Sequence, residues 1–375
     1  MRLLHTVGSI DSDHSGVAVC VKNLARSQAR LGEKPNIYTM TEPNSIEDQG
    51  VVTRRFSPGF FNNNLILNLG WSRALRKSIT AEQFHVVHTH GLWLGLNSYQ
   101  SKSTKFVISP HGMLSSVALE FSKFKKAAAL AFYQRGALNS AHLLMASAMS
   151  EYNDIRSFGL RQPVAIIPHG IDVGPVKKIN TKNDELVVIS LGRIHPKKGL
   201  INLVNAWAQL TDRYPNWILK IVGPDEDNHT QELKGLVRNL NLKRVEILPA
   251  VYGTEKVALM EAASLFVLPS FSENFALTVA ESLALGVPVI ATNGTPWEGL
   301  ELENCGWWID VGIKPLVQAL DTAMALPETS RHELGQRGRN WMLRDFTWLN
   351  AASQSIEVYN WLIHGGEVPP SIHLD

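Results

Sequence analysis

Short apolar runs alternate with longer segments of helical periodicity along most of this 375-residue chain. In the first half, the apolar runs predict strands at residues 3–7, 36–39, 51–56, 86–89, 106–109, 142–146 and 164–167. Apolar positions three or four residues apart predict helices at residues 17–31, 65–79, 117–138 and 150–158. Because continuous apolar strands separated by helices are typical of a parallel sheet covered on both faces, we expect a doubly wound α/β domain here.

The alternation stops and then begins again in the second half of the chain. Residues 169–185 are rich in polar, glycine and proline positions and are expected to form a linker between domains 1–168 and 186–347. The second domain has predicted strands at 186–191, 217–222, 245–248, 265–268 and 287–291 and helices at 200–210, 231–240, 255–262 and 276–285. Residues 348–375 begin with an amphipathic helix, at 348–364, and are expected to pack back on the first domain. Two such domains imply a ligand site in a cleft between them.

Composition narrows the class of protein. The chain is 45% hydrophobic and 19% charged, which supplies two cores and excludes disorder. Its net charge of +2 argues against a nucleic-acid partner. The two cysteines, Cys20 and Cys305, exclude a disulfide scaffold and fit a cytoplasmic location. Since no stretch approaches roughly 20 uncharged apolar residues, any membrane contact should be peripheral, at the inner face.

The most informative stretch is SENFALTVAE, which follows the strand predicted at 265–268. A helix predicted to begin near Ala276 presents unpaired backbone N–H groups, which favour a bound phosphate. Glu273 precedes that helix and Glu281 lies within it, so their carboxylates could accept hydrogen bonds from sugar hydroxyls. The alternative, that Glu273 caps the helix and Glu281 lies on a solvated face, stays open at this point.

Two further loops offer groups that could bind an anion. In LGRIHPKKG, Arg193 and Lys198 follow the strand predicted at 186–191, where two cations could neutralise a diphosphate leaving group. In the loop after the first strand, Gly16 precedes a helix and would let backbone approach an anion. Ordinary surface charges and an ordinary turn are the alternatives.

Histidines follow two strands of the first domain. In SPHGM, His111 could donate a hydrogen bond to a sugar or an oxyanion, or could belong to a plain turn. In HTHG, His88 and His90 share one face of a strand, as metal ligands would, but no third ligand is evident in the sequence, and we expect no metal site. In PDEDN, Asp225 and Asp227 are better explained by a polar turn than by a metal-binding motif.

Taken together, GRIHPKKG, VEILPAVYGTEK, SENFALTVAE, HVVHTHGLW and SPHGM resemble the family-four retaining glycosyltransferases of the GT-B fold, of the type that builds bacterial surface polysaccharides. The resemblance covers nearly the whole chain and implies two Rossmann-like domains that face a cleft. It implies transfer of a sugar from a nucleotide-diphosphate sugar to a glycan or lipid-linked acceptor, with retention at the anomeric carbon, in lipopolysaccharide, capsule or exopolysaccharide synthesis. No metal or other cofactor is expected, since members of this kind carry the leaving-group charge on cations and helix N-termini.

The resemblance also implies a role for each matching position, with His111 and Glu273 at the reaction centre. The other implied contacts are Arg193, Lys198, Gly16, Ala276 and Leu277 with the donor diphosphate, Asn274 and Phe275 with the donor sugar, Glu281 with the ribose, and Val251 and Tyr252 with the nucleobase. The chain departs from the family where Ser15 precedes Gly16, because many members carry paired glycines there.

The segment EFSKFKKAAALAFYQRGAL combines Phe121, Phe124 and Phe132 with three lysines. It is expected either to meet an anionic lipid surface or to be a core helix with a solvated lysine face. A nucleotide-sugar epimerase, a sugar phosphorylase and a non-catalytic nucleotide-sugar binding protein are the competing functions. The sequence does not distinguish a UDP donor from a GDP donor.

Overall fold

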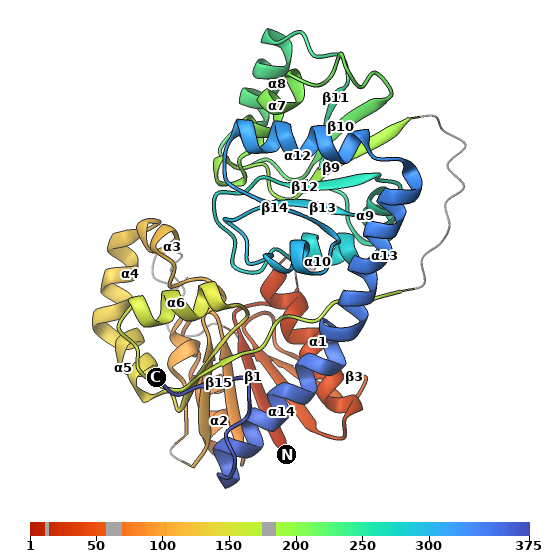
Figure 1. Cartoon of the computed structure of the whole chain (residues 1–375). Helices are drawn as coiled ribbons and strands as arrows, with labels where there is room; N and C mark the ends of the chain where they lie inside the picture. The colour runs from red at the N-terminus through yellow and green to blue at the C-terminus, as the bar shows by residue number, and fades with distance from the viewer. Residues whose placement is uncertain (12–14, 58–69, 102, 175–184) are drawn as a thin grey trace. The chain divides into compact units, whose positions relative to one another are not determined.

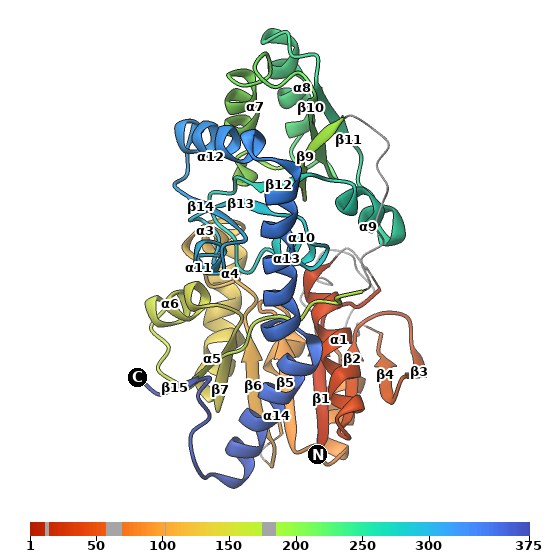
Figure 2. The same cartoon turned by 45° about the vertical axis from the view of Figure 1, so that its right-hand side comes forward.

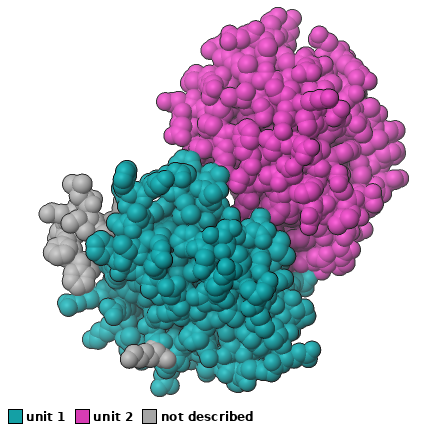
Figure 3. Space-filling view, turned by 60° about the vertical axis from the view of Figure 1, so that its left-hand side comes forward, with its two compact units in different colours: residues 1–170, 348–375 teal, residues 171–347 magenta. Residues whose placement is uncertain are grey.

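The computed structural model describes residues 1–11, 15–57, 70–101, 103–174 and 185–375. The chain forms two compact units, one of Met1–Gly170 with Trp348–Asp375 and one of Ile171–Thr347, drawn in teal and magenta in Figure 3. The division falls at Gly170, two residues beyond the end of the expected first domain. Residues 175–184 of the expected linker lie outside the described residues.

The first unit is built on a nine-stranded sheet in the order β15-β8-β7-β6-β5-β1-β2-β4-β3. Its strands are β1 (Arg2–Val7), β2 (Lys34–Thr39), β3 (Asn44–Asp48), β4 (Val51–Arg55), β5 (Val86–His90), β6 (Lys105–Ser109), β7 (Leu143–Ala146), β8 (Val164–Ile166) and β15 (Ile372–His373). Neighbouring strands from β8 to β4 pair in parallel, whereas β3 and β15 add antiparallel edges. The parallel pairing confirms a doubly wound first domain.

Helices cover this sheet and connect its strands. They are α1 (Gly16–Arg30), α2 (Arg73–Ala81), η2 (Gly95–Ser98), α3 (Ser116–Glu120), α4 (Lys123–Ala129), η3 (Leu130–Gln134), α5 (Arg135–Ser140), α6 (Met149–Ser157) and α14 (Trp348–His364). The single helix predicted at 117–138 is wrong. The backbone turns out of the helix at Phe121, Ser122 takes a left-handed conformation, and a π-helical turn (η3) separates α4 from α5.

The second unit has a six-stranded parallel sheet in the order β11-β10-β9-β12-β13-β14. Its strands are β9 (Leu186–Leu191), β10 (Trp217–Val222), β11 (Val245–Leu248), β12 (Leu265–Leu268), β13 (Val289–Thr292) and β14 (Gly306–Ile309). Counted from β9, this is the order 3-2-1-4-5-6 of a dinucleotide-binding sheet, with its topological switch between β9 and β12. Ligands bind at the carboxyl ends of strands beside such a switch.

The helices of the second unit are η4 (Pro196–Lys198), α7 (Leu200–Ala208), α8 (His229–Asn239), α9 (Gly253–Glu261), α10 (Leu277–Ala284), α11 (Gly299–Leu302), α12 (Ile313–Ala325) and α13 (Glu328–Asp345). Two hydrophobic clusters fill the space beside the sheet, one around Phe266 and Trp297 and the other around Trp207 and Leu219. These layers confirm the second doubly wound domain.

The last helix belongs to the first unit. α14 packs against α1 (Figure 1). Val358 and Tyr359 of α14 are buried with Leu3 and Val107 of the sheet. The apolar spacing along α14 buries one face of the helix, which ties the end of the chain to the first strand. No helix among the described residues is long and apolar enough to cross a membrane.

Candidate functional site

Three loops of the second unit meet at the carboxyl ends of β9, β12 and β13. Phe271 N donates to the carbonyl oxygen of Lys197 over 2.9 Å, and Glu273 N donates to that of Gly294 over 2.7 Å. Gly199 has a φ of 67°, and a Cβ added there would lie 2.1 Å from the carbonyl oxygen of Pro269. Only glycine permits that approach, which explains the glycine that ends GRIHPKKG.

This arrangement brings Lys198 and Glu273 together. Lys198 Nζ lies 2.6 Å from Glu273 Oε1, and the hydroxyl of Ser270 donates to the same oxygen over 2.6 Å. Both charged side chains are largely buried, at 16% and 14% exposure. Among the described residues no hydrogen bond reaches Oε2 of Glu273, which can accept a bond from a ligand.

The helix that follows begins as the sequence predicted. The N-cap residue of α10, Ala276, has a φ of 63° and provides no side-chain cap, and Leu277 opens the helix. Glu273 pairs with Lys198 and Ser270 and so does not cap α10. The positive end of the helix dipole lies at this loop and favours an anion.

Glu281, one turn into α10, pairs with Lys256 of α9. Lys256 Nζ lies 2.6 Å from the Glu281 carboxylate and donates to Oε1. Oε2 of Glu281 also lies 2.6 Å from Lys256 Nζ, so the ammonium group contacts both oxygens of the carboxylate. A carboxylate has about four lone-pair sites, so a ligand hydroxyl could share the Glu281 carboxylate with Lys256. Val251 and Tyr252 directly precede α9, and Tyr252 is 44% exposed.

The other predicted positions of the second unit have partners of their own or lie in the loop beside Glu273. Nη1 of Arg193 donates to both carboxylate oxygens of Glu226, at 2.9 and 3.0 Å, and the Arg193 side chain is 60% exposed. The side chain of Phe275 is buried against Trp297, whose indole N–H donates to the Phe275 carbonyl oxygen, so only its backbone can face a ligand. Asn274 lies between Glu273 and Phe275 in the same loop. Asp225 accepts from Thr230 N, as expected of a polar turn.

In the first unit, His111 follows β6 in a strained turn. Its φ of 53° is left-handed, and Gly112, with a φ of 73°, donates its N–H to Glu151 Oε1 over 2.7 Å. Glu151 is 2% exposed and also accepts from Ser147. A left-handed conformation is uncommon in non-glycine residues, although histidine adopts it more readily than most, and it fixes the direction of the His111 side chain here.

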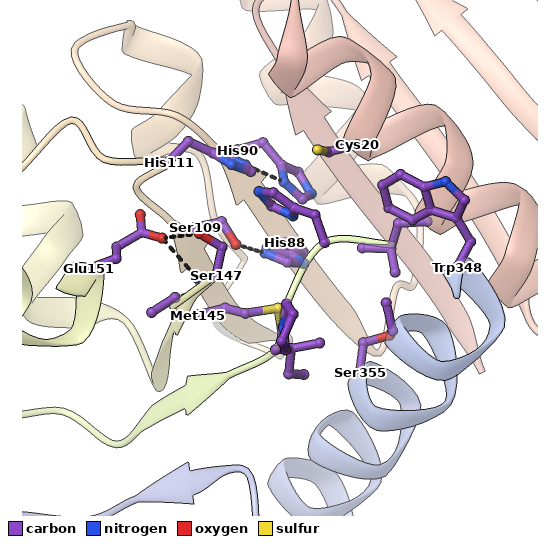
Figure 4. A pocket seen from close by; sticks show the side chains of 16 residues that line it. Cys20, His88, His90, Ser109, His111, Met145, Ser147, Glu151, Trp348 and Ser355 are labelled. Carbon is purple, nitrogen blue, oxygen red and sulfur yellow. Dashed lines mark hydrogen bonds between the residues drawn. The ribbon is translucent and has the colours of Figure 1, made fainter. Parts of the chain in front are cut away.

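His111 lines a pocket with His88, His90, Glu151 and His169 (Figure 4). The pocket has a volume of about 30 Å³, far below the roughly 300 Å³ of a site that encloses a whole ligand, so it suits a group the size of a hydroxyl. Burial lowers the pKa of His111 to about 3 and that of His169 to about 4. These rings are therefore neutral near pH 7.

A third imidazole lies beside His88 and His90, contrary to the sequence reading that none was evident. His5, His88 and His90 each have a ring nitrogen within 4.8 Å of the others, a spacing that could hold a metal ion. Every ring nitrogen of the three already has a hydrogen-bond partner: Gln28 and His90 for His5, Tyr359 and Ser109 for His88, and His5 and His111 for His90. A metal ion at this position would have to displace these hydrogen bonds.

Gly16 is the first residue of α1, and Ser15 is its N-cap, with the hydroxyl accepting from Ala18 N. Many members of the family that the sequence resembles have a glycine at the position of Ser15. In this chain the serine caps the N-terminus of α1. Residues 12–14 of this loop lie outside the described residues.

The sequence analysis did not predict several residues that contact the Lys198–Glu273 site or the histidine pocket. They are His5, Gln28, Glu151, His169, Lys256 and Ser270. Only Ser270 carried a usable signal, since it follows β12 directly and lies three residues before Glu273. The others come from distant segments, and no local spacing connects them.

Two family models match the chain, one on each side of residue 175. The model described as Glycosyltransferase Family 4 matches residues 14–174, and the one described as Glycosyl transferases group 1 matches residues 176–341. An uncharacterized glycosyltransferase of Haemophilus influenzae is 32% identical over 39% of this chain and 42% of its own length. The alpha-monoglucosyldiacylglycerol synthase of Streptococcus pneumoniae is 23% identical over 86% of this chain and 78% of its own length. The match thus spans less than half of the length of the Haemophilus influenzae protein.

Solved structures share the fold. Sucrose-phosphate synthase from Thermosynechococcus elongatus superposes with a TM-score of 0.79 at 22% identity, over 97% of this chain and 100% of its own. Anabaena Alr3699/HepE, in complex with UDP and glucose, superposes with a TM-score of 0.72 at 17% identity, over 96% and 99% of the two chains. These likenesses confirm the GT-B fold. The two family models together span most of the chain, and it belongs to the family-four glycosyltransferases of the GT-B fold.

Proposed function

We propose that this protein transfers a sugar from a nucleotide-diphosphate sugar to a glycan or lipid-linked acceptor, with retention of anomeric configuration, in bacterial surface-polysaccharide synthesis. The observation that carries the donor part is the group at the switch between β9 and β12. It combines a largely buried cation, a carboxylate oxygen open to a hydroxyl and a helix N-terminus, and Glu281 adds a second carboxylate, which is paired with Lys256. A diphosphate flanked by hydroxyl-rich groups satisfies all of these at once.

Each group has a role in this proposal. Lys198 and the start of α10, at Ala276 and Leu277, stabilise the charge that develops on the diphosphate leaving group. Glu273 binds a hydroxyl of the transferred sugar, beside Asn274 and the backbone of Phe275. Glu281 binds the ribose, and Val251 with Tyr252 contacts the base. Arg193 joins the diphosphate only when it leaves Glu226, which is feasible for an exposed ion pair.

The first unit holds the acceptor side. His111 contacts the sugar near the reaction centre, and Gly16 lets the backbone of the α1 loop approach the donor phosphate. We also propose that this unit meets an anionic membrane through α3, α4 and η3, where Phe124 is 93% and Phe132 86% exposed beside Lys123 and Lys125. The synthase of Streptococcus pneumoniae has a lipid-linked sugar in its name, which supports a lipid-linked acceptor here.

A thermal-shift measurement with UDP and with GDP, both in EDTA, tests the donor site first. A ligand at about 100 times its Kd adds about 2.7 kcal/mol to the free energy of unfolding. We expect a shift with one nucleotide only, and UDP is favoured by the likeness to a structure that holds UDP and glucose. The same shift in Glu281→Gln should be smaller, because the ribose contact is weakened. No shift with either nucleotide in the wild type would contradict the donor site.

Turnover assays separate the competing functions. A transferase consumes the nucleotide sugar only with an acceptor, and the proton spectrum of the product shows whether the anomeric configuration is retained. An epimerase would convert the nucleotide sugar alone, and a phosphorylase would need inorganic phosphate. Binding without turnover on any acceptor would instead favour a binding protein. Transfer that persists in EDTA is the expected result for a reaction without a metal.

A further inference from the structure

A continuous row of buried hydrogen bonds runs through the first unit from α14 to the pocket. Gln28 Nε2 lies 2.9 Å from Ser355 Oγ, and Gln28 Oε1 lies 2.8 Å from His5 Nε2. His5 Nδ1 lies 2.9 Å from His90 Nε2, and His90 Nδ1 lies 3.0 Å from His111 Nε2. The row therefore joins α14, α1, β1, β5 and the loop after β6, and its end at His111 lines the pocket of Figure 4.

The donor and acceptor in the bonds of Gln28 with Ser355 and His5 follow from the hydroxyl of Ser355. The hydroxyl of Ser355 donates its one proton to the carbonyl oxygen of Ala352, over 2.7 Å, so its oxygen accepts from the amide N–H of Gln28. The amide oxygen of Gln28 is thereby turned toward His5. Since an amide oxygen can only accept, the proton of His5 lies on Nε2.

The remaining bonds follow because a neutral imidazole carries a single ring proton. Burial lowers the pKa of His5 to about 4 and that of His90 well below its usual value, so these rings are neutral near pH 7. His5 Nδ1 has no proton and accepts from His90 Nε2, which leaves His90 Nδ1 to accept from His111 Nε2. The proton of His111 is then on Nε2, and its Nδ1 carries a lone pair. Within the described residues Nδ1 of His111 has no hydrogen-bond partner.

We propose that Gln28 sets the tautomer of His111 through His5 and His90, so that His111 offers the pocket an acceptor nitrogen that binds a hydroxyl and rejects an anionic oxygen. Gln28 is a positioning residue, 23 residues from His5 in sequence and fully buried. A carboxylate or phosphate oxygen would meet a lone pair at Nδ1, neutral imidazoles around it, and the negative charge of Glu151 on the same pocket. The inference rests on the proposed function only in assigning the hydroxyl to a sugar.

The tautomers can be read without any substrate. In histidine labelled with ¹⁵N, the two ring nitrogens of a neutral imidazole resonate at separate positions according to which one carries the proton. We expect the wild type at pH 7.5 to show His5, His90 and His111 all protonated on Nε2. Each ring is assigned from the signal that disappears in the corresponding His→Gln variant.

Substitution of Gln28 by methionine should reverse the donor and acceptor roles of the histidine ring nitrogens along the row. Gln28→Met keeps the size of the side chain but removes the acceptor of the His5 Nε2 proton. His5 then gains a partner by donating from Nδ1, His90 follows, and the proton of His111 moves to Nδ1. Ser109→Ala is the matched control, since it removes a buried hydrogen bond to His88 but none of the row. It should leave the tautomer of His111 unchanged.

Kinetics give the second measurement. We expect Gln28→Met to lower kcat of sugar transfer by about tenfold or more, because the hydroxyl loses its acceptor, while the shift with nucleotide stays as in the wild type. A His111 protonated on Nδ1 in the wild type, or an unchanged His111 in folded Gln28→Met, would overturn the proposal. So would a stoichiometric transition metal on His5 and His90 in the purified protein. Absence of transfer in the wild type would refute the proposed function and leave the tautomer result intact.

Discussion

At the scale of single residues, charge and hydrogen bonding concentrate on few side chains. The bond from Lys198 to Glu273 holds two opposite charges in a largely buried position, where neither would be stable alone. The pair keeps the cation directed at the loop before α10 when no ligand is bound. A ligand diphosphate can then share Lys198 with Glu273 without a large rearrangement.

Removal of either member of this pair should abolish most of the transfer activity. We expect Lys198→Met and Glu273→Gln each to lower kcat by about 10²- to 10³-fold, as when one stabilising group of a transition state is lost. The measurement is the initial rate of sugar transfer, with circular dichroism to show an intact fold. Lys220→Met is the control, because Lys220 also pairs with a glutamate of the second unit but lies on β10. Near-normal rates in both variants would contradict the role of the pair.

The buried histidines should make the first unit sensitive to acid. In the unfolded chain a histidine has a pKa near 6.5, whereas burial lowers the pKa to about 4 for His5 and His169 and to about 3 for His111. The unfolded state therefore binds more protons between these values, and the free energy of unfolding falls as the pH falls below about 6.5. Each ring should contribute a loss on the order of 1–2 kcal/mol by pH 5.

Urea unfolding between pH 7.5 and 5 measures this loss. His169→Gln should reduce the pH dependence, since it removes one group that gains a proton on unfolding. A free energy of unfolding that stays constant from pH 7.5 to 5 would show that the native rings take up protons as easily as the unfolded ones.

At the scale of elements, every strand predicted from an apolar run forms, with boundaries within two residues, but the sequence analysis did not predict the apolar strand β14, the short strand β15 or the helices α11, α12 and α13. It missed β3, whose residues are all exposed, because such a strand has no buried face to impose a pattern. It joined α3, α4 and α5 into one helix, since a left-handed Ser122 and a π-helical turn leave the helical periodicity nearly unchanged.

The sequence analysis missed His5 and Gln28 as site residues because their contacts depend on the order of strands in the sheet. Glu273 and Lys198 were found because the loops that hold them carry local motifs.

The broken helix carries its own prediction. Phe124 and Phe132 are exposed, so replacing them removes apolar surface from the solvent and leaves the core unchanged. We expect Phe124→Ser/Phe132→Ser to lower binding to vesicles of anionic lipid several-fold in a flotation assay, with an unchanged Tm. The control is Leu302→Ser in the second unit, where another apolar side chain is 80% exposed. Equal flotation of the wild type with neutral and anionic vesicles would exclude the membrane role.

At the scale of the whole molecule, the chain leaves the first unit after Gly170 and returns to it at Trp348. The returning helix is part of the first core, because Val358 and Tyr359 are fully buried among residues of the first sheet. The stability of the first unit thus depends on a helix that is separated from residues 1–170 by the whole second unit in sequence.

A cavity in this helix should therefore weaken one unit selectively. We expect Tyr359→Ala to cost about 3–5 kcal/mol, in the range found for large aromatic side chains removed from a core. Hydrogen exchange read by mass spectrometry should show faster exchange in peptides of residues 1–170 and little change in those of 185–347. Faster exchange of equal size in both sets would mean that the two units unfold together.

The bond between Gln28 and Ser355 spans 327 positions of sequence, and this separation has a consequence for synthesis. A ribosome that has just released residues 1–170 has not yet made α14. The face of α1 that α14 covers, with the amide of Gln28, therefore stays exposed in the nascent chain until α14 has been made. The second domain is continuous in sequence and can complete its core earlier. Domains usually fold in the order in which they are made, and in this chain the first to be translated is the last to be finished.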